Sequence, residues 1–176
     1  MGDVETEENI TTTNNPLILS LVDVYEDYIS NSNSDVYDFV DHSFVLSPNE
    51  INTFLKLISS TTKQHMALSN TGYFINRLIG LSSDRAGNKD FYLDLNDFPP
   101  LFYLIKNLHG SEDKPLNVVI DGSVGDGLAE KSGHVNLFVN GNVGRHFAQK
   151  SYHVNATIKG NLGRFAGAGC AKLTMA

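Results

Sequence analysis

The sequence predicts an α+β protein in which a helical N-terminal region is followed by a single-stranded β-helix (a β-solenoid) with a 19-residue repeat. The helical region is predicted because apolar residues recur there at three- and four-residue intervals. The solenoid is predicted because the chain from residue 116 onward can be written, without gaps, in rows of nineteen that share most columns. A chain of 176 residues, 41% of them apolar, is long enough to bury a core in such a fold.

Helix-start signals divide the N-terminal region. Residues 1–15 are polar and acidic, and we expect a disordered tail there. Asn15 and Pro16 form an N-cap followed by a first-turn proline, which predicts that a helix begins at this point. Residues 47–50, Ser-Pro-Asn-Glu, form a capping box and predict a second helix. The spacing of apolar residues predicts a third helix over 71–81.

A short strand is predicted near 90–95, where Phe91, Leu93 and Leu95 alternate with polar residues. We assign this strand, together with the helices, to a mostly α-helical cap region over residues 16–114. The β-solenoid is then expected to occupy residues 115–176.

Each row of the repeat begins with a strand-like segment and continues into paired glycines. The predicted coils cover about 116–134, 135–153 and 154–172, and a fourth begins at 173. Alternate residues of each strand-like segment are apolar, so one face should point into the core. A phosphate-binding loop would place its glycines once, between a strand and a helix, whereas these recur with the repeat. We therefore expect turn glycines where φ is positive or where the next coil approaches too closely for a Cβ atom, namely Gly122, Gly125, Gly141, Gly144, Gly160 and Gly163.

The segments GNVGRHFAQKSYHV and GNLGRFAGAGCAKLTM resemble the GXGXG solenoid. That repeat forms the C-terminal domain of the glutamate synthase large subunit and most of one of the subunits of formylmethanofuran dehydrogenase. The similarity covers about residues 116–176, a third of the chain, and implies a β-helix with a mainly structural role and with the paired glycines at its corners. The catalytic activity of those enzymes does not carry over, because the single cysteine, Cys170, lies inside a coil and cannot hold an iron–sulfur cluster.

Two further columns hold candidate contact residues. His134 and His153 share one column and are expected to form a polar ladder, since two ligands are too few for a stable zinc site. Arg145 and Arg164 share another column, in which Asp126 can pair with Arg145. An arginine ladder can bind a carboxylate, a phosphate or an acidic partner. No residue is assigned a catalytic, cofactor-binding or metal-binding role.

Charge is distributed unevenly along the chain. Residues 1–50 hold 11 acidic residues and no lysine or arginine, whereas residues 131–176 hold 6 basic residues and no acidic one. This asymmetry indicates either a basic binding face or two segments that dock on each other. We expect docking, because so few scattered charges make a poor nucleic-acid face. No apolar run is long enough to span a membrane, and the acidic start and single cysteine predict a cytoplasmic protein.

Three functions are open at this point. The first, which we favour, is a non-catalytic structural or interaction β-helix protein without a cofactor, either self-contained or a fragment of a longer repeat protein. The second is a subunit or fragment of a GXGXG-containing oxidoreductase of the glutamate synthase or formylmethanofuran dehydrogenase type. The third is an anion-binding module that uses the arginine ladder. The expected partner is another protein, further repeats or a second copy in a homo-oligomer, at the open C-terminal edge, rather than nucleic acid or a membrane.

Overall fold

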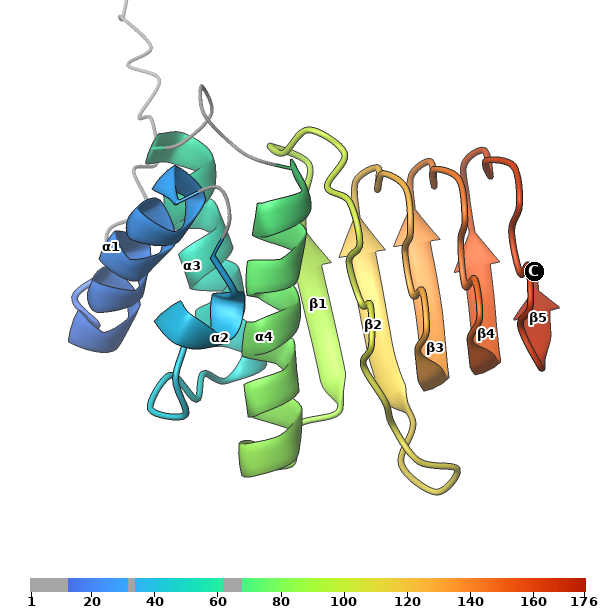
Figure 1. The fold of residues 1–176 in the computed structure, drawn as a ribbon, viewed down its shortest axis with the longest axis horizontal. Coiled ribbons are helices and arrows are strands. Elements are labelled where there is room, and N and C mark those ends of the chain that lie inside the picture. Colours follow the sequence, from blue (N-terminus) through green and yellow to red (C-terminus); the bar gives the residue numbers. More distant parts are fainter. Residues whose placement is uncertain (1–12, 32–33, 62–67) are drawn as a thin grey trace, which may run out of the picture.

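A computed structural model describes residues 13–31, 34–61 and 68–176. Four helices lie at one end of the molecule, and five strands form a single sheet that runs away from them (Figure 1). The combination of an N-terminal helical region and a parallel β-solenoid with 19-residue turns confirms the predicted α+β fold class. Most of the predicted disordered tail, residues 1–12, lies outside the described residues.

The helices begin where the sequence places their caps. The side chain of Asn15 accepts a hydrogen bond from the backbone N–H of Leu17, and Pro16 occupies the first helical turn. Ser47 and Glu50 form the predicted capping box, with the Glu50 carboxylate accepting from the backbone N–H of Ser47 at 2.8 Å. Hydrogen bonds from the backbone and hydroxyl of Ser47 lower the pKa of Glu50. The four helices are α1 (Pro16–Ser30), α2 (Val36–Phe39), α3 (Pro48–Thr61) and α4 (Leu68–Ala86).

The sheet is entirely parallel, and its strands follow one another in chain order. From the second strand onward, each strand residue pairs with the residue nineteen positions later, as Asn117 does with Asn136 and Asn136 with Asn155. A second, shorter line of contacts joins Val124, Val143 and Leu162 in adjacent coils. The strands are β1 (Asp90–Asp94), β2 (Leu116–Asp121), β3 (Gly133–Asn140), β4 (Tyr152–Ile158) and β5 (Leu173–Met175).

The solenoid begins earlier than the sequence repeat indicates. Strand β1 was expected inside the helical cap region over 16–114, but it pairs with β2 as the first strand of the sheet. Residues 90–115 therefore form a first coil. Its register differs from that of the others, because Asp90 pairs with Asn117 whereas Leu101 contacts Val124. Extra residues on either side of Leu101 disguise this coil in the sequence.

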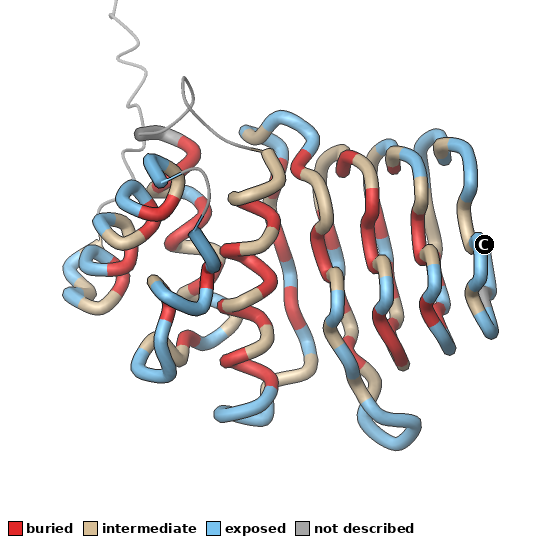
Figure 2. Tube along the Cα trace, viewed as in Figure 1, coloured by how far each residue is buried: buried red, intermediate tan, exposed pale blue. Residues whose placement is uncertain are grey.

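One hydrophobic core extends from the helices into the coils (Figure 2). In the helical part, the rings of Tyr25, Phe54 and Phe74 pack within 5.9 Å of one another and are fully buried. In the coils, alternate strand residues such as Val118 and Leu137 point inward. Among the described helices, none is both long and apolar enough to cross a membrane.

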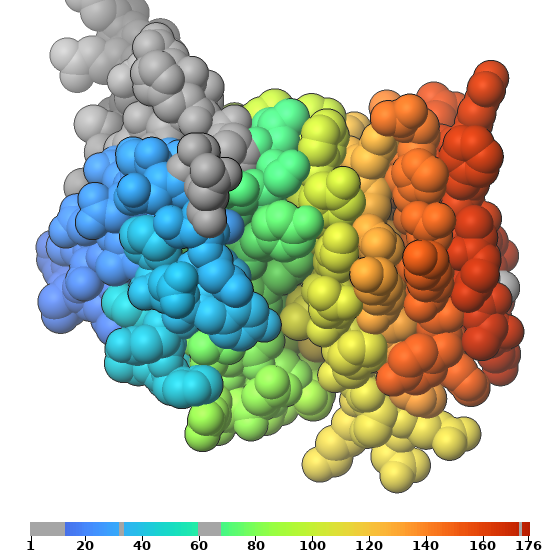
Figure 3. All heavy atoms as spheres, in the orientation of Figure 1, coloured from blue at the N-terminus to red at the C-terminus, as the bar shows by residue number. Residues whose placement is uncertain are grey.

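Within the described ranges, the acidic and basic segments do not dock on each other. Helix α1 packs against α3 and α4, whereas β4 and β5 lie at the far end of the molecule (Figure 3). The expected docking of these segments is wrong for the described residues, because α3, α4 and the first two coils lie between them (Figure 1). The charge asymmetry therefore becomes a dipole, with an acidic helical end and a basic solenoid end.

Candidate functional site

The paired glycines stand where one coil presses on the coil before it. A Cβ atom on Gly144 would lie 2.6 Å from the carbonyl carbon of Gly125 and 2.7 Å from the backbone nitrogen of Asp126. A Cβ atom on Gly163 would meet the backbone of Gly144 in the same way, and Gly141 and Gly160 repeat the pattern at the first glycine of each pair. Backbone approach, more than backbone conformation, excludes a side chain from these positions. In the first repeat row, Gly125 faces the ring of Phe102, and Gly122 combines a φ of 121° with close contact to Leu95.

Each glycine pair leads into a corner segment of unusual backbone. We call residues 102–107, 126–131, 145–150 and 164–169 the corner segments. Every second residue in them has a left-handed backbone, with φ between 51° and 79°. Most of these residues are not glycine, although the left-handed region disfavours side chains by about 1–2 kcal/mol. The left-handed positions are Tyr103, Ile105, Asn107, Gly127, Ala129, Lys131, His146, Ala148, Lys150, Phe165, Gly167 and Gly169.

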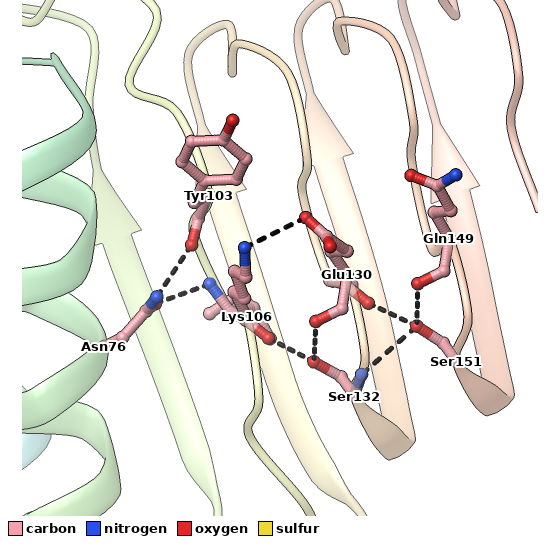
Figure 4. A network of polar contacts seen from close by, with 9 residues as sticks. Asn76, Tyr103, Lys106, Glu130, Ser132, Gln149 and Ser151 are labelled. Carbon is pink, nitrogen blue, oxygen red and sulfur yellow. Dashed lines mark hydrogen bonds and ion pairs between the residues drawn. The ribbon is translucent and has the colours of Figure 1, made fainter.

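Hydrogen bonds between coils hold the corner segments in this conformation. The backbone N–H of Gly127 donates to Arg145, and that of His146 donates to Arg164 in the next coil. The buried hydroxyl of Ser151 donates to the carbonyl of Ala129 at 2.5 Å, and the hydroxyl of Ser132 donates in the same way to Ile105 (Figure 4). Every coil therefore depends on its neighbours for its shape.

Two helix side chains supply this contact to the first coil. The Asn76 amide of α4 donates to the carbonyl of Tyr103 at 2.7 Å and accepts from the N–H of Ile105 at 2.6 Å (Figure 4). The Asn52 amide of α3 accepts from the N–H of Asp94 at 3.2 Å and donates to the carbonyl of Tyr92. A side-chain amide thus takes the place of the peptide group that a preceding parallel strand would present.

The arginine column is half paired. Arg145 donates to the Asp126 carboxylate through Nε and Nη2, at 3.0 and 2.8 Å, which confirms the expected pair. These hydrogen bonds lower the pKa of Asp126. Arg164 is exposed and forms no ion pair with any described residue. Lys131 and Lys150 lie exposed at the ends of the corner segments that hold Asp126 and Arg145, and neither forms an ion pair with a described residue.

The Asp126–Arg145 pair gives a prediction about pH. A carboxyl whose pKa is lowered by folding adds stability above its unfolded pKa, about 3.9, and this is lost as the pH falls through the folded value. We expect Asp126→Asn to lower the free energy of unfolding at pH 7 by less than about 1 kcal/mol, since the pair is partly exposed. This difference should shrink toward about pH 2, as measured by urea unfolding at both pH values. In an Arg145→Ala background the pH 7 effect should be smaller, and an effect independent of pH would contradict the assignment.

The histidine column stacks as expected. The rings of His134 and His153 are 4.7 Å apart, and Tyr152 packs edge-on against His134. Tyr152 also stacks on His109 of the first coil. Within the described ranges, no three histidine, cysteine or acidic side chains are grouped in a way that could hold a metal ion. The cluster is thus a ladder of aromatic and polar rings on the surface of the coils.

A groove of roughly 380 Å³ lies on the corner segments between the first and third coils. Tyr103 and His146 stand at its two ends, and Gly127 lies between them in the same column. Two ion pairs line it, Arg145–Asp126 and Lys106–Glu130, the latter at 3.2 Å and largely shielded from solvent. Sequence reasoning missed this groove, because it depends on the first coil, whose register the repeat does not reveal.

Cys170 is half-buried, and its thiol donates to the backbone carbonyl of Lys172 at 3.3 Å. It occupies the column of Ser132 and Ser151, at the end of a corner segment.

In comparisons with known proteins, no family model, curated protein or solved structure matches the chain significantly.

Proposed function

We propose that this protein is a structural interaction protein whose basic corner segments bind an acidic segment of a protein partner. The observation that carries the proposal is the separation of charge along the long axis of the molecule. The helices, which hold most of the described acidic residues of the first fifty, form one end of the molecule, and the later coils form the other (Figure 3). Lys131, Lys150 and Arg164 of these coils are exposed.

The unpaired basic groups supply the attraction. Lys131, Lys150 and Arg164 project from successive corner segments and form no ion pair with a described residue. Lys131 and Lys150 share one column of the repeat and stand one coil apart, roughly 4.8 Å. Arg164 lies one coil further on, in the column of Asp126 and Arg145. Cations that project from a rigid backbone suit an extended chain of carboxylates, because the coils themselves need not reorganise on binding.

The experiment measures binding of a fluorescently labelled decaglutamate peptide by anisotropy. We expect binding that weakens between about 50 and 300 mM salt. The variant Lys131→Glu/Lys150→Glu/Arg164→Glu should weaken it by about tenfold or more. The matched control Lys56→Glu/Arg85→Glu/Lys114→Glu makes the same charge change outside the corner segments, at exposed positions, and should retain most of the binding.

Three outcomes would overturn the proposal. The first is a wild-type protein that does not bind the peptide at about 50 mM salt. The second is an equal loss in both triple variants, because the effect would then follow net charge instead of the corner segments. The third is tighter binding to labelled oligothymidylate of about 20 nucleotides than to decaglutamate, which would indicate a nucleic-acid partner.

The GXGXG resemblance supports a second proposal, in which the chain is a subunit or fragment of an oxidoreductase of the glutamate synthase or formylmethanofuran dehydrogenase type. The supporting observation is that Gly141, Gly144, Gly160 and Gly163 all lie against the backbone of the preceding coil, as a tightly wound glycine solenoid requires. The test is purification of the protein from the cells that produce it. A co-purifying protein with flavin or iron–sulfur absorption would support this proposal, and a chain that purifies without one would contradict it.

A further inference from the structure

One column of the corner segments is an interrupted stack of rings. Its members are Tyr103, Gly127, His146 and Phe165, one from each successive coil, and all four have φ between 59° and 79°. Their backbone N–H groups are also equivalent, since those of Tyr103, Gly127 and His146 each donate to the next coil in the same way. Side chains at these positions therefore leave the backbone in the same direction. Glycine supplies no ring at the second position.

The ring on each side of Gly127 stacks on a further ring. His146 stacks on Phe165, with ring centres 5.2 Å apart and an angle of 11° between the planes. Tyr103 stacks on Tyr73 of α4 at 5.5 Å and 5°. No ring contact joins Tyr103 to His146 in the part of the chain that the structure describes. Two rigid aromatic walls thus stand on either side of a gap.

The gap is the groove between the first and third coils. The Tyr103 ring leans over Gly127, where a Cβ atom would lie 2.5 Å from its Cδ1 atom. The groove that Tyr103, Gly127 and His146 line together with the two ion pairs holds roughly 380 Å³, which is room for one planar ring with its substituents. Stacked coils are about 4.8 Å apart, so walls two coils apart leave the thickness of a single ring.

We propose that this groove binds a planar heteroaromatic ring, which inserts between Tyr103 and His146 and completes the stack. Tyrosine and histidine faces are suitable stacking partners, and both are held in place before the ligand arrives.

The rim selects the kind of ring. Arg145–Asp126 lies on one side of the Gly127 position and Lys106–Glu130 on the other, with Gln149 beside Glu130 (Figure 4 shows the second side). The charges of each pair cancel, so the rim favours neither an anion nor a cation. It offers donors and acceptors on both sides, which suits a ring with hydrogen-bonding edges over a plain hydrocarbon ring.

Such a ring can belong to a free heterocycle or to an aromatic side chain of a bound peptide. The experiment therefore titrates the full chain with adenosine and, separately, with N-acetyltryptophanamide, and follows binding by NMR chemical-shift changes. N-acetylleucinamide, which is apolar and not planar, is the control ligand. We expect at least one ring compound to bind, with shifts at Tyr103 and His146, and the compound that binds more tightly identifies the source.

Two variants test the position of the site. His146→Ala removes one wall and should weaken binding about tenfold. Gly127→His adds a ring in the same column, and because its Cβ would lie 2.5 Å from Cδ1 of Tyr103 it also displaces that wall, so it should abolish binding. Lys172→Ala, at an exposed position outside the groove, should leave binding unchanged. The proposal is overturned if neither ring compound binds at about 10 mM, if N-acetylleucinamide binds equally well, or if His146→Ala binds as the wild type does.

Discussion

Gly144→Val is expected to lower the free energy of unfolding by about 3 kcal/mol, because the new side chain would overlap the backbone of the preceding coil. Its Cβ atom alone would lie 2.6 Å from the carbonyl carbon of Gly125 and 2.5 Å from the Asp126 carboxylate. The backbone of a central coil cannot shift without disturbing the hydrogen bonds on both of its sides. Urea unfolding followed by circular dichroism measures the change.

A matched control separates close approach from backbone conformation. Gly87 has a φ of 72° but no atom within 4 Å of the position its Cβ would occupy. Gly87→Ala should therefore lower the free energy of unfolding only by the cost of the left-handed conformation, about 1 kcal/mol. Gly144→Ala should lower it by more, because its Cβ also meets the preceding coil. If Gly144→Val unfolds at the same urea concentration as the wild type, the register of the coils is wrong.

Asn76→Leu should lower the free energy of unfolding by about 3 kcal/mol, since it leaves two backbone groups without partners. Asn76 is 7% exposed, and it satisfies both the carbonyl of Tyr103 and the N–H of Ile105. Leucine has a similar volume and keeps the packing of α4, so the loss reports the hydrogen bonds. The same urea titration measures it.

Asn52→Leu is the matched comparison, because Asn52 makes the same pair of contacts at a more exposed site. Water can replace its amide, so we expect a loss of about 1 kcal/mol. Equal losses in the two variants would show that burial of the Asn76 contact does not matter, and would contradict the capping role assigned to it.

The fold could be predicted from the sequence wherever side chains repeat. Glycine recurs every nineteen residues because the close backbone contact between coils leaves no room for a side chain. This recurrence predicted both the period and the strand register of the later coils. The helix starts at Pro16 and Pro48 were readable because capping residues have local causes. The Asp126–Arg145 pair followed directly from the register.

Other features have no signal in a single sequence. The first coil was missed because Pro99-Pro100 and the loop at 111–114 change its spacing relative to the second. The left-handed backbone at residues such as Lys150 and Phe165 was missed because lysine and phenylalanine do not favour it. An asparagine within a helix, such as Asn76, gives no indication that it caps a sheet. The expected docking of the acidic segment on the basic segment was wrong for the described residues, because opposite charges in a sequence do not determine how far apart the two segments lie in the fold.

The alternation of left- and right-handed residues in the corner segments determines how the protein can fold. A coil on its own would carry the strain of three left-handed positions without the hydrogen bonds that offset it. Each coil therefore needs a template already in place. The later coils find this template in one another, and only the first needs one of a different kind, which Asn52 and Asn76 provide. We therefore expect folding to begin at the helices and to propagate through the coils away from them.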